Sequence, residues 1–193
     1  MSRVAVTVIT LLLALVALPA GAQAPRPPTK SPPPPSAPSP AGPKSLGVFQ
    51  GWTAAEIAPK DGKVCYAVAR PAKSDGKYAK RGEVLLVVTH RPAAKSQDVV
   101  TFQAGYPLKE GAKISLAVDA KRTFELVARP DVDPESAWAA DDKTDKAITA
   151  ALKSGKSVTV KGASARNSET TDTFALAGFN QAYGAIGKAC GVK

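Results

Sequence analysis

Apolar and polar residues alternate along most of the chain after Leu46, as in strands with one buried face. Residues 64–69 are the clearest case, and residues 83–89 contain an unbroken apolar run, Val84 to Val88, which favours a central strand buried on both faces. Residues 119–121 are short enough for a hairpin turn between two of the remaining strands. Those strands are predicted at residues 99–104, 114–118, 124–126, 158–160 and 173–177.

Two segments have the helical period instead. Residues 141–154 place four apolar side chains on one helical face, and Asp141 can cap its beginning. Residues 179–190 form a second stripe, which points Cys190 toward the core: Phe179, Ala182, Tyr183, Ile186 and Cys190. The pattern predicts a mainly β protein, an antiparallel β-sandwich-like domain with a middle helix and a C-terminal helix.

The first 22 residues have the features of a cleavable signal peptide. Arg3 supplies positive charge, residues 4–18 are nearly all apolar, and Ala20-Gly21-Ala22 offers the small residues that a signal peptidase requires. Cleavage after Ala24 is the alternative site, and an uncleaved membrane anchor is the rival interpretation. We expect the protein to be exported to the periplasm. The outer surface of the cell and secretion are the further destinations.

Residues 23–44 form a proline-rich linker, because ten of the seventeen prolines fall there. Proline fixes the backbone and removes hydrogen-bond donors, so an extended polyproline II segment is expected rather than a folded one. Residues 45–193 then make a single β-rich domain, a length that allows a real hydrophobic core.

The two cysteines, Cys65 and Cys190, predict one disulfide in an oxidising compartment. Such a bond would join the start of the domain to its end. Two free thiols, one of them catalytic, are the alternative.

Net charge is +10, which favours anionic partners. Five basic residues lie between the strands around Cys65 and Val84, and others gather near His90 at the opposite end of the expected hairpin. A solvated loop is the plain alternative for both groups. The candidate anion-binding residues are Arg70, Lys73, Lys77, Lys80, Arg81, His90 and Arg91.

Few features of the sequence indicate catalytic activity. His90 is the only histidine, no orienting acid or nucleophile accompanies it at a recognisable spacing, and no catalytic residue or cofactor is assigned. One histidine and two cysteines expected in a bridge argue against a zinc site. The acidic residues at 131–142 could hold Ca²⁺, but they equally suit the start of a helix, so no metal is assigned. Trp52 and Trp138 are predicted to lie in the core.

Several short strings occur in an order that resembles the invasion-associated locus B family, whose members are exported proteins of α-proteobacteria. The resemblance covers residues 46–191 and implies a periplasmic or surface β-rich domain without established enzymatic activity. It also implies a link to host-cell invasion in pathogenic members. The strings are THRP (residues 89–92), AGY (104–106), AWAAD (137–141), DTFALAGF (172–179) and KAC (188–190).

Together these features predict an exported cell-envelope or surface interaction protein without enzymatic activity, linked to host-cell invasion or envelope maintenance. Its partner would be an anionic envelope or host-surface component, or another envelope protein. Nucleic acid is excluded by the export signal and the lack of interleaved aromatic residues, and no transmembrane segment remains after signal cleavage. One alternative is an envelope enzyme that acts on an anionic substrate with His90 and Arg91 in its site. A folding factor that binds unfolded chains is the other.

Overall fold

The structure, a computed structural model, describes residues 42–76 and 80–192. The predicted signal peptide, nearly all of the predicted linker and the candidate residue Lys77 lie outside these ranges. Within them, no helix is long and apolar enough to cross a membrane.

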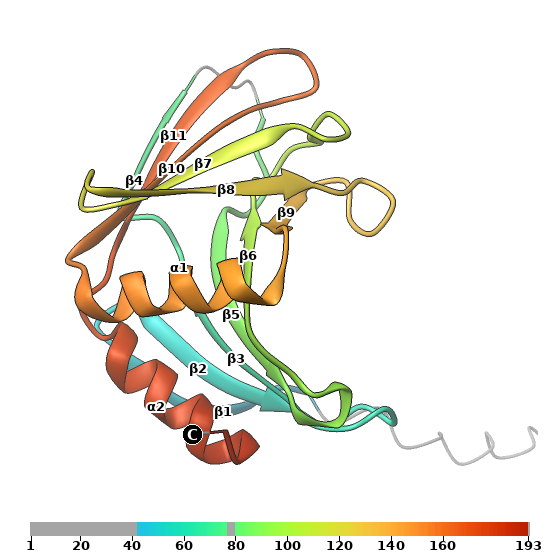
Figure 1. The fold of residues 1–193 in the computed structure, drawn as a ribbon, viewed down its shortest axis with the longest axis vertical. Helices are drawn as coiled ribbons and strands as arrows, with labels where there is room; N and C mark the ends of the chain where they lie inside the picture. Colours follow the sequence, from blue (N-terminus) through green and yellow to red (C-terminus); the bar gives the residue numbers. More distant parts are fainter. Residues whose placement is uncertain (1–41, 77–79, 193) are drawn as a thin grey trace, which may run out of the picture. The chain divides into compact units, whose positions relative to one another are not determined.

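The described residues form eleven strands in one antiparallel sheet, together with two α-helices (Figure 1). This confirms the mainly β class with a middle and a C-terminal helix. The strands are β1 (Lys44–Phe49), β2 (Trp52–Ile57), β3 (Val64–Ala69), β4 (Lys73–Gly76), β5 (Leu85–Arg91), β6 (Ser96–Gln103), β7 (Lys113–Val118), β8 (Arg122–Ala128), β9 (Ser136–Ala139), β10 (Ser157–Ala163) and β11 (Glu169–Ala175). The helices are α1 (Asp142–Ser154) and α2 (Phe179–Cys190), and the strand order is β1-β2-β3-β5-β6-β9-β8-β7-β10-β11-β4.

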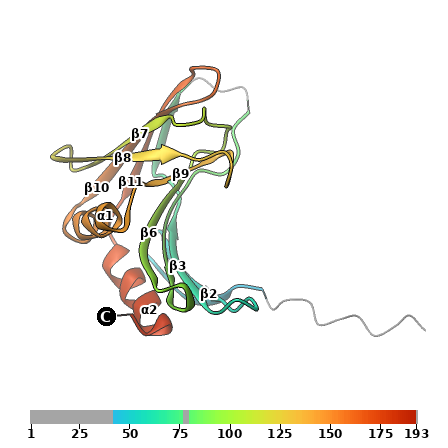
Figure 2. The ribbon, with the colours of Figure 1, turned by 45° about the vertical axis from the view of Figure 1, so that its right-hand side comes forward.

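The sheet folds back on itself around one hydrophobic core. The rings of Phe102 on β6 and Phe174 on β11 meet at 6.4 Å, although their strands are far apart in the sheet order. The indole nitrogen of Trp52 donates a hydrogen bond to the Ala175 carbonyl at 2.9 Å. Both helices lie on the inner side of strands β2, β3 and β6 (Figure 2). Two layers of strands therefore share a core with the helices, as the sandwich-like prediction requires.

Local sequence signals explain the elements that were predicted best. Strand β3 and helix α2 have the predicted bounds, and α1 begins after Asp141, whose carboxylate accepts a hydrogen bond from the Thr144 amide at 2.7 Å. That bond satisfies an amide left unpaired by the first helical turn. The turn between β7 and β8 places Asp119 and Ala120 at positive φ, as a tight hairpin needs.

Several features differ from the sequence prediction, which also did not place strands β1, β2 and β9. Strand β4 lies within what was expected to be a loop, where it pairs with β11 at the edge of the sheet. Leu85 and Val87 on β5 stay partly exposed while Leu86 and Val88 are fully buried, so the expectation of burial on both faces is wrong. Trp52 is fully buried as predicted, whereas Trp138 is only partly buried.

Candidate binding groove

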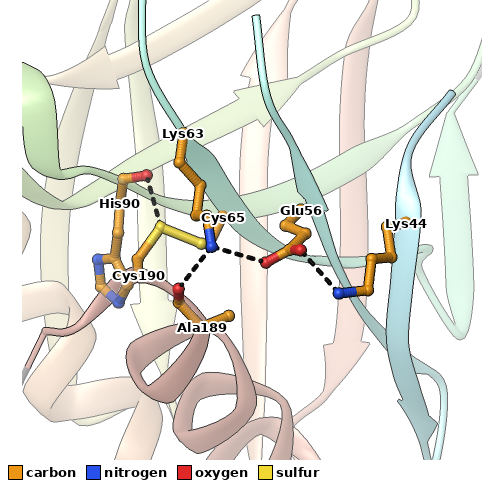
Figure 3. Close-up of polar contacts among 7 residues, drawn as sticks. All are labelled: Lys44, Glu56, Lys63, Cys65, His90, Ala189 and Cys190. Carbon is orange, nitrogen blue, oxygen red and sulfur yellow. Dashed lines mark hydrogen bonds and ion pairs between the residues drawn. A yellow bond between two sulfur atoms is a disulfide. The ribbon is translucent and has the colours of Figure 1, made fainter. Parts of the chain in front are cut away.

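Four neighbouring strands carry a row of polar side chains on the side of the sheet that faces α2. Lys44, Glu56, Cys65 and His90 are successive register partners on β1, β2, β3 and β5. Register partners point to the same face of a sheet, so their side chains stand beside one another (Figure 3).

The predicted disulfide is present and fixes α2 over this row. Cys65 is joined to Cys190, the last residue of the helix, and no free cysteine occurs among the described residues. Cys65 is fully buried and Cys190 is 9% exposed, which confirms that the helical stripe directs Cys190 inward. The helix therefore ends at a defined position over β3 and leaves part of β1 and β2 uncovered.

An open groove of about 410 Å³ follows this uncovered strip between α2 and the first two strands. Its apolar residues are Leu46, Ala185 and Ala189. A β-bulge between Ser45 and Gly47 makes Leu46 the extra residue of β1, so that it faces the groove together with Lys44. The charged side chains of the groove are Lys44, Glu56, Lys63 and Lys188.

The charges of the groove do not balance. Glu56 accepts from the ammonium groups of Lys44 at 3.0 Å and Lys63 at 3.4 Å. The hydrogen bond from Lys44 is the main reason that the pKa of Glu56 lies below its usual value, so this carboxylate is ionised at neutral pH. Lys63 also donates to the Ala189 carbonyl at 3.2 Å, which stabilises the C-terminal end of α2. With exposed Lys188, the groove holds three ammonium groups and one carboxylate, which suits an anionic ligand.

His90 lies beside the disulfide but is closed off from solvent. It is fully buried; its Nδ1 accepts a hydrogen bond from the Asp98 amide at 3.2 Å, and its Nε2 has no partner among the described residues. The Tyr183 ring stands nearly perpendicular to it at 5.2 Å, and the Tyr183 hydroxyl donates to Asp98 at 2.7 Å. Burial lowers the pKa of His90, so the imidazole is neutral. A substrate therefore has no path to His90 in this arrangement.

The other candidate anion-binding residues are dispersed, and several already have carboxylate partners. Arg81 forms a two-pronged ion pair with fully buried Asp172 at 2.8 and 2.6 Å. Arg70 pairs with Glu83, and Lys73 pairs with Asp75 at 2.8 Å. The side chains of Lys80 and Arg91 are exposed. Arg91 ends β5, whereas Lys80 and Arg81 precede the start of that strand.

The sequence analysis placed a group of basic residues near His90 but did not assign the groove. Lys44 and Leu46 are far from Lys188 in the sequence. The pairing of β1 with β2 and the packing of α2 on the sheet, to which the disulfide adds a covalent link, bring them together. In the described ranges, no three His, Cys, Asp or Glu side chains cluster closely enough to hold a metal ion.

Comparison with known proteins gives one match. A family model described as "Invasion associated locus B (IalB) protein" matches residues 52–187, which confirms the resemblance seen in the sequence. No curated protein and no solved structure matches. The matched region begins at β2 and ends before the last turn of α2. It includes Cys65, whereas Cys190 lies three residues beyond it.

Proposed function

Because the chain belongs to the invasion-associated locus B family, we propose that it is an exported, non-enzymatic interaction protein of the cell envelope or surface that binds an anionic partner in the α2 groove. The partner is an envelope or host-surface component, or an acidic surface of another envelope protein. A role in host-cell invasion or envelope maintenance follows from that binding.

The excess of ammonium groups around the groove carries this proposal. Lys44, Lys63 and Lys188 surround an apolar floor with one carboxylate among them. Lysine near an anionic surface contributes roughly 1 kcal/mol of attraction, which falls as salt screens the charges. The apolar floor favours a ligand that carries hydrocarbon next to its negative group, because both parts then find complementary surface.

Export is supported by the predicted signal peptide, the family and the disulfide. A disulfide between two buried sulfur atoms is typical of proteins from oxidising compartments. The family is not a known enzyme family. The alternative, an envelope enzyme with His90 and Arg91 in its site, finds no support in a histidine that is fully buried and held by a backbone amide.

Binding to anionic probes at several salt concentrations tests the proposal. The full chain is titrated with lipopolysaccharide and, separately, with phosphatidylglycerol vesicles, and Lys188→Glu is compared with Lys146→Glu. Both substitutions reverse one exposed helical lysine, but Lys146 lies on α1 outside the groove. We expect binding that weakens with salt and a loss of at least about tenfold for Lys188→Glu only, from reversing one charge contact.

Two further variants separate the remaining interpretations. The variants Arg91→Glu and Lys80→Glu test the two basic groups that the sequence analysis placed at opposite ends of the hairpin. A larger loss of affinity for either variant than for Lys188→Glu would place the binding site in those loops. Equal losses for Lys146→Glu and Lys188→Glu would show attraction by net charge alone. No salt-sensitive binding to either probe would refute the anionic partner.

A further inference from the structure

Strand β1 stands at one end of the strand order, so it pairs only with β2. The two-residue turn at Gln50 and Gly51 makes Phe49 and Trp52 the hydrogen-bonded pair that closes the hairpin. Hydrogen-bonded and non-bonded pairs alternate along a hairpin, so the backbone N–H and C=O of Val48 point away from β2. No described residue outside β2 makes a backbone hydrogen bond to β1. This edge can therefore accept another strand.

The two edges of the sheet differ in length and in charge. At the opposite edge, β4 has four residues, of which Lys73 and Asp75 form an ion pair at 2.8 Å. Short edges that carry charges resist pairing with another chain. Strand β1 has six residues with one charge, on Lys44, and its Val48 side chain is 69% exposed. A strand added beside β1 would cover that valine, because cross-strand neighbours on one face lie about 5 Å apart.

The α2 groove runs along β1 and offers contacts for the side chains of an added strand. Lys44 and Leu46 of β1 line one side of the groove, and Lys188 of α2 lines the other. Figure 3 shows Lys44 at the end of the polar row that is farthest from His90, at the edge of the sheet. Side chains of an added strand alternate between the two faces. One set would therefore stand beside Lys44 and Leu46, and the other beside Val48.

We propose that the partner bound in the groove is an extended acidic segment of another envelope protein, which adds to β1 as a further strand. This inference rests on the proposed function of the groove. Charge selects the occupant, because three ammonium groups surround one carboxylate and Lys188 forms no ion pair with a described residue. Residues 23–41 contain no Asp or Glu, and a second copy of β1 would bring its own Lys44, so neither supplies negative charge. A segment that alternates acidic with apolar residues would complement both the groove and Val48.

Titration of the full chain with synthetic peptides tests the inference. The probe is a peptide of about ten residues with blocked ends that alternates glutamate with valine, which is long enough to span β1. One control peptide has lysine in place of glutamate. The other keeps every side chain but carries methyl groups on its backbone nitrogens, which removes the hydrogen-bond donors without changing the charge. We expect binding that weakens with salt and an affinity at least about tenfold lower for each control.

Variants of the edge strand separate backbone pairing from charge. Val48→Pro removes the N–H that points away from β2, a position at which edge strands tolerate proline. The matched control, Val48→Thr, has nearly the same shape and keeps that N–H. We expect Val48→Pro to weaken peptide binding by about tenfold or more and lipopolysaccharide binding by less than about twofold, whereas Lys188→Glu weakens both. Hydrogen exchange at the Val48 amide of the unaltered protein should slow when the peptide binds.

The outcomes distinguish failure of this inference from failure of the proposed function. Lys188-dependent binding of lipopolysaccharide or phosphatidylglycerol vesicles without binding of the peptide would overturn the added strand and keep the anionic partner. Absence of binding to all three probes would refute both. Equal affinity for the methylated peptide, or unchanged exchange at the Val48 amide, would show that charge alone attracts the peptide and would also overturn the inference. These two measurements decide the matter even where Val48→Pro fails to fold.

Discussion

Loss of the Cys65–Cys190 disulfide should destabilise the protein mainly through its unfolded state. The bond joins residues 125 positions apart, and cross-linking a loop of that length removes about 5 kcal/mol of chain entropy from the unfolded chain at 25 °C. In the native state, other contacts hold α2 against the sheet without the disulfide. The Phe179 ring packs against Trp52 at 4.8 Å, and the Tyr183 hydroxyl donates to Asp98 at 2.7 Å.

The assay is urea unfolding of the oxidised protein and of the double variant Cys65→Ala/Cys190→Ala. We expect the variant to keep a native near-ultraviolet spectrum, to lose about 3–5 kcal/mol of unfolding free energy and to show a steeper dependence on urea, because its unfolded chain exposes more surface. Reductant should leave the variant unchanged. A loss below about 1 kcal/mol, or a variant that loses its native spectrum without urea, would refute the reasoning.

Four other substitutions probe the ion pairs described above, a buried carboxyl group and a close backbone contact. Arg81→Met leaves fully buried Asp172 unpaired and should cost about 3–5 kcal/mol in urea unfolding, whereas Arg70→Met, at an exposed pair, should cost less than about 1 kcal/mol. Burial raises the pKa of Asp145 from 3.8 to about 6, so its carboxyl stabilises the fold at low pH and that stability is lost as pH rises through 6; Asp145→Asn should flatten the pH dependence between pH 4 and 7, by about 3 kcal/mol at most. Gly178→Ala should lower the melting temperature, because φ is +86° and the new Cβ would lie 2.0 Å from a backbone oxygen; an unchanged melting temperature would contradict that contact.

The predictions that succeeded rest on signals carried by neighbouring residues. The bounds of α2 follow from apolar residues three and four positions apart, and the same stripe oriented Cys190 toward the core. The start of α1 follows from one capping side chain, Asp141. Such signals depend only on residues close together in the sequence, so they can be recognised without knowledge of the tertiary structure.

The features that were missed depend on distant pairings. All four residues of β4 are exposed, and the strand exists because its backbone bonds to β11, so its side chains carry no apolar pattern. Arg81 is one of the candidate anion-binding residues of the sequence analysis, and in the fold a carboxylate 91 residues away accepts its hydrogen bonds. A basic side chain in a sequence gives no sign of whether its counter-ion comes from the same fold or from a ligand.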